Sequence, residues 1–81
     1  MKIALELKIM SEGEVEAGRT IGADSLAQLP IPIPNIGERI VFAAHGTLYR
    51  GIVKHKEVEL IQIDDPEDGV LSITVWADQE P

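Results

Sequence analysis

The chain of 81 residues contains no cysteine. Disulfide bonds and thiolate metal sites are therefore excluded, while the redox compartment stays open. A domain of this size lies near the lower limit for a self-sufficient hydrophobic core, and such domains commonly rely on disulfides, a metal or oligomerisation. We therefore expect self-association, with a homodimer as the simplest symmetric assembly.

Positive charge is also scarce, because 7 lysines and arginines stand against 14 aspartates and glutamates and the net charge is −7. Non-specific nucleic-acid binding needs basic side chains that displace counterions from phosphates, so nucleic acid is not the expected partner. No apolar run is long enough for a membrane-spanning helix or a signal-peptide core. These absences predict no membrane partner and a cytoplasmic location.

The few bases are unevenly placed along the chain. Residues 39–56 carry four lysines and arginines without an acid, whereas residues 64–80 carry six acids without a base. One interpretation is that neighbouring strands carry complementary charges, which stabilise pairing by at most ~1 kcal/mol each. The other is a basic, anion-binding face beside an acidic edge.

Motifs for catalysis, metals and cofactors are missing. His45 and His55 do not have ligand spacing, and Lys54 and Lys56 on either side of His55 disfavour a bound cation. The serines have no nucleophile motif, and the glycines lead into no phosphate-binding helix. The acidic loop 64–68 lacks the calcium-loop pattern and is interpreted as a solvated turn. We therefore expect no metal, no cofactor and no enzymatic activity.

Alternation of apolar and polar residues predicts an all-β fold. Residues 2–10 alternate strictly, and turn residues at 11–14 predict a hairpin with a return strand around 15–21. Further strands are expected over 39–44, 47–56 and 70–76. Together they predict one domain over 1–81, a five- to six-stranded antiparallel barrel or sandwich with at most one short helical turn.

The segment before the third strand has its own signals. Asp24 is expected to cap a single helical turn that ends near Leu29. The alternating prolines at 30–34 predict a polyproline-like connector outside the sheet, because proline fixes φ and lacks the N–H donor. His45-Gly46 predicts the turn of the next hairpin.

Irregularities are expected later in the chain. Gly51 predicts a bulge or a close approach within its strand. The apolar register shifts further on, which predicts a bend or second bulge between Lys56 and Leu60. Proline and glycine predict a hairpin loop over 64–69, and the tail 77–81 is expected to fray.

Two short segments carry a resemblance to known proteins. They are PNIGERI at 34–40 and YRGIV at 49–53. This pattern resembles the start of SH3-like small barrels and of short uncharacterised bacterial all-β proteins, and it covers about a third of the chain. The resemblance implies a small barrel. An aromatic ligand groove like that of true SH3 domains is not evident, so binding of proline-rich peptides is not carried over.

Trp76 is the most informative aromatic residue. Alternation in the last strand places Leu71, Ile73 and Val75 toward the core and Trp76 on the opposite face. An exposed tryptophan on a strand is often the anchor of an interface. The alternative is that Trp76 wraps over the barrel end as part of the core.

Three classes of function follow from these features. The first is a non-catalytic interaction module that self-associates and binds a protein partner through an exposed strand edge or the Trp76 face. The second is a nucleic-acid-binding barrel with Tyr49 as a stacking surface among the bases. The third is a small ligand bound at a dimer cleft. The candidate binding residues are Arg39, Tyr49, Arg50, Lys54, His55 and Trp76.

Overall fold

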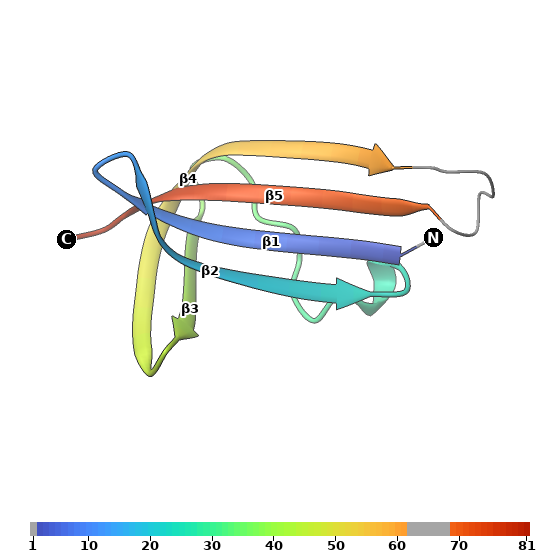
Figure 1. The fold of residues 1–81 in the computed structure, drawn as a ribbon, viewed down its shortest axis with the longest axis horizontal. Helices are drawn as coiled ribbons and strands as arrows, with labels where there is room; N and C mark the ends of the chain where they lie inside the picture. Colours follow the sequence, from blue (N-terminus) through green and yellow to red (C-terminus); the bar gives the residue numbers. More distant parts are fainter. Residues whose placement is uncertain (1, 62–68) are drawn as a thin grey trace.

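The computed structural model describes residues 2–61 and 69–81 and shows an all-β domain (Figure 1). Its elements are β1 (Lys2–Ser11), β2 (Glu14–Ala23), the 3-10 turn η1 (Leu26–Gln28), β3 (Arg39–Ala44), β4 (Thr47–Ile61) and β5 (Val70–Gln79). The all-β prediction and the first four strand positions are thus confirmed, although β4 and β5 extend further than expected. The expected loop over 64–69 lies, apart from Gly69, outside the described residues.

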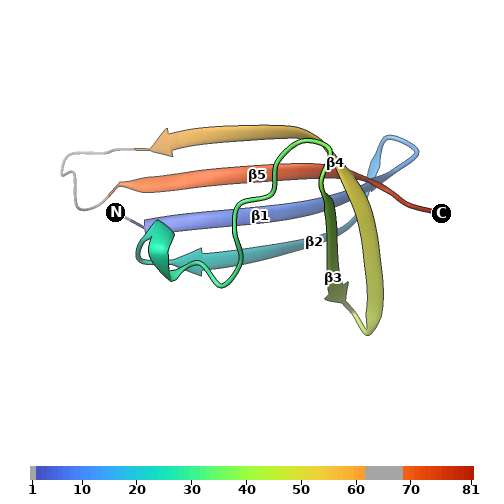
Figure 2. The ribbon, with the colours of Figure 1, turned by 180° about the vertical axis from the view of Figure 1, so that it is seen from behind.

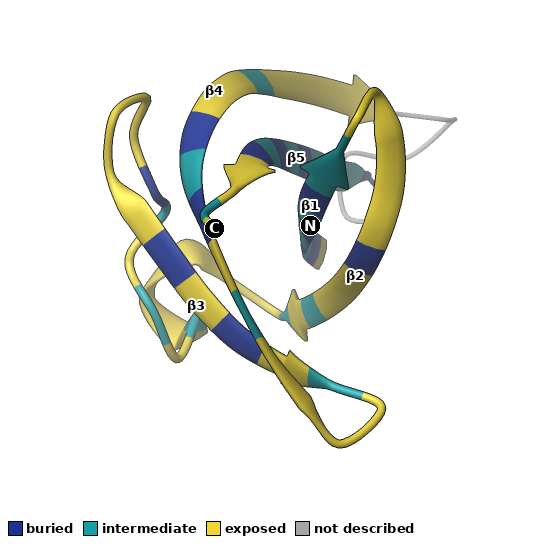
Figure 3. Ribbon diagram, turned by 90° about the vertical axis from the view of Figure 1, so that its left-hand side faces the viewer, coloured by how far each residue is buried: buried dark blue, intermediate teal, exposed yellow. Residues whose placement is uncertain are grey.

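The strands form one sheet in the order β2-β1-β5-β4-β3. Three neighbouring pairs are antiparallel, but β1 and β5 lie parallel at the centre of the sheet (Figure 1). An antiparallel arrangement throughout was expected, and the parallel pair is the departure from it. The sheet curls so that its two end strands, β2 and β3, approach each other in a nearly closed barrel (Figure 3).

The alternating residues of β1 and β5 supply most of the core. Leu5 and Ile9 of β1, Val75 of β5 and Val53 of β4 are fully buried on the inner face of the sheet. Phe42 and Ile40 on β3 complete this face, and exposed residues alternate with them along the strand (Figure 3). Burying each such side chain stabilises the fold by about 1.5–3 kcal/mol before entropy is counted.

The segment between β2 and β3 crosses the inner face of the sheet (Figure 2). It forms the connector, residues 24–38, and Leu29, Ile31 and Ile33 pack against the core. The expected single helical turn is present as η1, but its N-cap is Ser25 and no side chain caps it, so the expected Asp24 cap is wrong. The prolines stay outside the sheet as predicted.

Strand β4 bends strongly along its length. Gly51 allows the close approach that was predicted, because a Cβ there would lie 2.8 Å from the carbonyl oxygen of Asp78. The register against β5 shifts between Val53 and His55, not between Lys56 and Leu60 as expected. The fraying expected from residue 77 is also wrong, because β5 continues to Gln79.

Candidate interaction surfaces

The predicted binding residues divide between the two faces of the sheet. The register places Arg39, Arg50, His55 and Trp76 on the outer face, and the exposed Lys54 lies at the bulge of β4. Tyr49 lies on the inner face, where its ring packs against Phe42 with centroids 6.3 Å apart. Tyr49 therefore lies on the face opposite Arg39 and Arg50, and on the same face as Lys56.

Trp76 lies in a row of side chains that crosses three strands. Its ring is 5.1 Å from the ring of His55 on β4, and Lys8 Nζ on β1 lies 5.5 Å from its centroid. His55 Nε2 lies 3.1 Å from Glu57 Oε1, and Lys8 Nζ lies 3.6 Å from a carboxylate oxygen of Glu6. His55 and Lys8 lie beside the indole, which is half-buried on the outer face.

Sequence reasoning missed Lys8 as a neighbour of Trp76. The two residues are directly paired in the parallel β1–β5 register, which joins the two ends of the chain. No local pattern in the sequence signals this pairing, because the strands are separated by most of the chain.

Arg39 is engaged with an acid of the C-terminal segment. Its Nε donates to both carboxylate oxygens of Glu80 at 3.0 Å, and Nη2 lies 3.0 Å from Oε1. The contact joins the basic segment 39–56 to the acidic segment 64–80. It agrees with the interpretation of complementary charges on neighbouring parts of the sheet.

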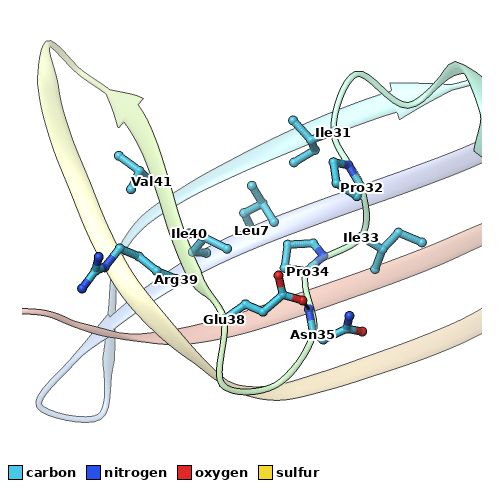
Figure 4. Close-up of a pocket in the computed structure, with 10 residues that line it drawn as sticks. All are labelled: Leu7, Ile31, Pro32, Ile33, Pro34, Asn35, Glu38, Arg39, Ile40 and Val41. Carbon is cyan, nitrogen blue, oxygen red and sulfur yellow. Dashed lines mark hydrogen bonds between the residues drawn. The ribbon is translucent and has the colours of Figure 1, made fainter.

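A groove of about 450 Å³ lies between β3 and the connector. Leu7 of β1 lies between its walls, with Ile31 on the connector side and Val41 on the β3 side (Figure 4). Its lining residues are Leu7, Ile31, Pro32, Ile33, Pro34, Asn35, Glu38, Arg39, Ile40 and Val41. The groove therefore has apolar walls and polar side chains at one end.

The polar side chains of the groove already bind the protein itself. A carboxylate oxygen of Glu38 accepts the N–H of Asn35 at 3.0 Å, and Asn35 Oδ1 accepts from Lys56 Nζ at 3.3 Å. Arg39 binds Glu80. These bonds fix the end of the connector and leave apolar contact as the main interaction that the groove offers.

The edge of β3 beside this groove has no neighbouring strand in the described sheet. Arg19 Nη1, from the other end strand, donates to the carbonyl oxygen of Ala43 at 3.0 Å, so that this carbonyl points away from β4. Successive residues direct their backbone groups to alternate edges. The N–H and C=O groups of Val41 and Arg39 therefore also point to the open edge.

Comparison with protein-family models, with curated proteins and with solved structures finds no match to this chain. Within residues 2–61 and 69–81, no group of three or more histidine, aspartate or glutamate side chains is arranged to hold a metal ion. In the same residues, no helix has the length and apolar character needed to cross a membrane.

Proposed function

We propose that this protein is a non-catalytic interaction module that holds an extended segment of a partner protein against β3. The observation that carries this proposal is the apolar groove beside a strand edge with open backbone groups. An extended segment can pair with such an edge through main-chain hydrogen bonds and place alternate side chains in an adjacent groove. Each apolar side chain buried there contributes about 1.5–3 kcal/mol.

The character of the groove favours a peptide segment over a small polar ligand. Small-molecule sites fix orientation with a few well-placed polar groups. Here Glu38, Asn35 and Arg39 are occupied by bonds within the protein. The open backbone groups of Val41 and Arg39 are suited to a chain that brings its own N–H and C=O groups.

Selection from a displayed library of random peptides tests the proposal. Peptides enriched on the protein are expected to lose binding to Val41→Pro, which removes a backbone donor at the open edge without breaking the β3–β4 ladder. Val41→Lys should weaken the same peptides by placing an ammonium group at the groove. Leu48→Lys is the matched control, because Leu48 is similarly exposed on the same hairpin but does not line the groove. Peptides that bind all variants equally would contradict the proposal.

Self-association is a second proposed property, and the outer face of the β3–β4 hairpin favours it. Val41 and Leu48 are 49% and 57% exposed there, and Val41 pairs with Arg50 across the two strands. Exposed apolar residues next to arginine are typical of interface cores. Light scattering across a range of protein concentrations should give the mass of a dimer, reduced to that of one chain by Leu48→Lys. A single-chain mass at every concentration would contradict it.

A further inference from the structure

Strand β4 continues well beyond its pairing with β3. β3 pairs with residues 47–52. Beyond them, the carbonyl oxygen of Val53 accepts from the N–H of Gly37, and the N–H of Val53 donates to the carbonyl oxygen of Glu38. From His55 to Ile61, β4 pairs with β5 on one side. No described residue forms a backbone hydrogen bond with the other side of this stretch. Residues 56–61 therefore form a second open edge, which we call the β4 edge.

The hydrogen-bond pattern shows which residues face the β4 edge. The N–H of Glu80 donates to the carbonyl of Arg50, so the even-numbered residues of β5 direct their backbone groups toward β4. Trp76 and Thr74 are paired with His55 and Glu57. Alternation along β4 then directs the backbone groups of Lys56, Val58 and Leu60 to the open side.

The side chains of the β4 edge divide by chemistry as well as by face. Val58 and Leu60 are paired with Ile73 and Leu71 and lie on the inner face, where they are 62% and 54% exposed. Glu57 and Glu59 lie on the outer face and are exposed. None of the residues that line the groove belongs to β4. The β4 edge is thus a separate surface. Its residues 57–60 have an apolar inner side and an acidic outer side, and they are flanked by Lys56 on the inner side and the exposed Ile61 on the outer side.

A second copy of the chain fits the β4 edge poorly. In antiparallel self-pairing, a register with Val58 opposite Val58 places Glu57 opposite Glu59 twice. A register with Val58 opposite Leu60 places Glu59 opposite its own copy. Like charges directly opposite each other on paired strands are destabilising, so both registers that place Val58 opposite an apolar residue are penalised.

We propose that the β4 edge binds an extended segment of a partner protein in which apolar and basic residues alternate. Such a segment pairs its backbone with Lys56, Val58 and Leu60. Its apolar side chains cover Val58 and Leu60 on the inner face, and its lysines or arginines lie opposite Glu57 and Glu59 on the outer face. Successive side chains of a strand point to opposite faces of the sheet. Apolar and basic residues must therefore alternate along the partner segment.

A pair of short synthetic peptides of identical composition tests the proposal. In one, valine alternates with lysine; in the other, the valines and lysines are grouped in two blocks. Fluorescence anisotropy should show binding of the alternating peptide at least about tenfold tighter than binding of the block peptide. Amide hydrogen exchange at Val58 and Leu60 should slow when the alternating peptide binds, because their N–H groups become hydrogen-bonded.

Charge reversal gives the second readout. Glu57→Lys/Glu59→Lys should weaken the alternating peptide about tenfold or more. The control Glu14→Lys/Glu16→Lys makes the same change in net charge on the exposed part of β2 and should have little effect. Equal binding of the two peptides, or equal weakening by both double variants, would overturn the proposal, since either result indicates general attraction to an acidic protein.

Two further outcomes would reassign the surface. Loss of peptide binding in Val41→Pro with retention in Val58→Pro would place the segment at β3 and overturn the proposal for the β4 edge. A dimer of the wild-type protein that Val58→Pro converts to single chains would show that a second copy occupies the edge. Binding lost in Val58→Pro and kept in Val41→Pro is the expected result, and it does not depend on whether the groove beside β3 is a binding site.

Discussion

Arg19 Nη1 donates a hydrogen bond of 3.0 Å to the carbonyl oxygen of Ala43 and so joins the two end strands of the sheet. Arg19 lies opposite Leu7 in the β1–β2 register, on the inner side of the sheet, and reaches across the remaining opening of the barrel. In a fully closed barrel, backbone hydrogen bonds join the first and last strands of the sheet. Here the side chain of Arg19 makes this connection instead.

The Arg19 contact predicts a specific effect of removing the guanidinium group. Arg19→Ala should lower the free energy of unfolding by about 1 kcal/mol, since one charge-assisted but exposed hydrogen bond is lost. Amide exchange should become faster in β2 and β3, while the amides of β1 and β5 keep their protection. Thr20→Ala, on the opposite face of β2, is the control. Uniformly faster exchange in all strands would contradict a local role in closure.

Gly51 predicts a position that does not accept a side chain. A Cβ there would lie 2.9 Å from both Ala77 Cβ and Ile9 Cδ1, besides the contact with the carbonyl of Asp78. Gly51→Ala should therefore cost about 1–3 kcal/mol in urea unfolding, because packed backbone and core atoms have to move.

Gly18→Ala is the matched substitution for Gly51→Ala. The nearest atom to its added Cβ is the carbonyl oxygen of Leu7 at 3.5 Å, which is an ordinary contact. It should be neutral or stabilise the protein by a few tenths of a kcal/mol, because alanine restricts the unfolded chain. A loss of stability as large as that of Gly51→Ala would contradict the packing argument.

The pair Arg39–Glu80 predicts a small coupling energy. The side chain of Arg39 is 61% exposed, so water and salt screen the attraction despite the favourable geometry. A double-mutant cycle with alanine at both positions should give about 0.5–1 kcal/mol, and the value should fall at high salt. The same cycle between Lys2 and Glu80 should give a coupling near zero. A coupling unchanged by salt would contradict this account.

Trp76 is the single tryptophan and reports on its own surroundings. Lys8→Ala removes the chain that lies over the indole, so acrylamide should quench its fluorescence more efficiently and the emission should move to longer wavelength. Lys2→Ala, on the same strand but paired with Val70, should leave the emission unchanged. Equal emission from both variants would show that Lys8 does not cover the ring.

Much of the local structure could be predicted because local patterns determine it. The alternation in 2–10 gave the position of β1, and the bounds of β3 were predicted correctly from apolar residues between turn signals. The turn at His45-Gly46 has positive φ at both residues, as tight hairpins with right-handed twist require. These features depend on neighbours within a few residues.

The bulge in β4 shows where a local pattern misleads. The sequence predicts an apolar register shift between Lys56 and Leu60, which is later than the shift in the structure. Lys56 lies on the inner side of the sheet, opposite Val75, and its long chain carries the ammonium group to Asn35 and the carbonyl oxygen of Pro34. A polar residue at an inward position therefore concealed the bulge at Lys54.

The candidate surfaces were predicted only in part. His55 and Trp76 were both chosen from the sequence, and the structure brings their rings together. Strand alternation places Tyr49 on the face opposite Arg39 and Arg50, and the groove was not predicted at all. The groove depends on where the connector crosses the sheet, which is decided by tertiary packing of Ile31 and Ile33 and not by their own sequence pattern.

The parallel pairing of β1 with β5 has a consequence for how the protein folds. During synthesis, hairpins β1–β2 and β3–β4 can form as soon as they leave the ribosome, yet the strand that joins them is made after both. The two hairpins can associate only after β5 has been made. Pairing β5 with β1 closes a loop that contains most of the chain, and the entropy cost of closing so long a loop slows this step. We therefore expect the two hairpins to be transient on the nascent chain and the sheet to form cooperatively only after β5 has emerged.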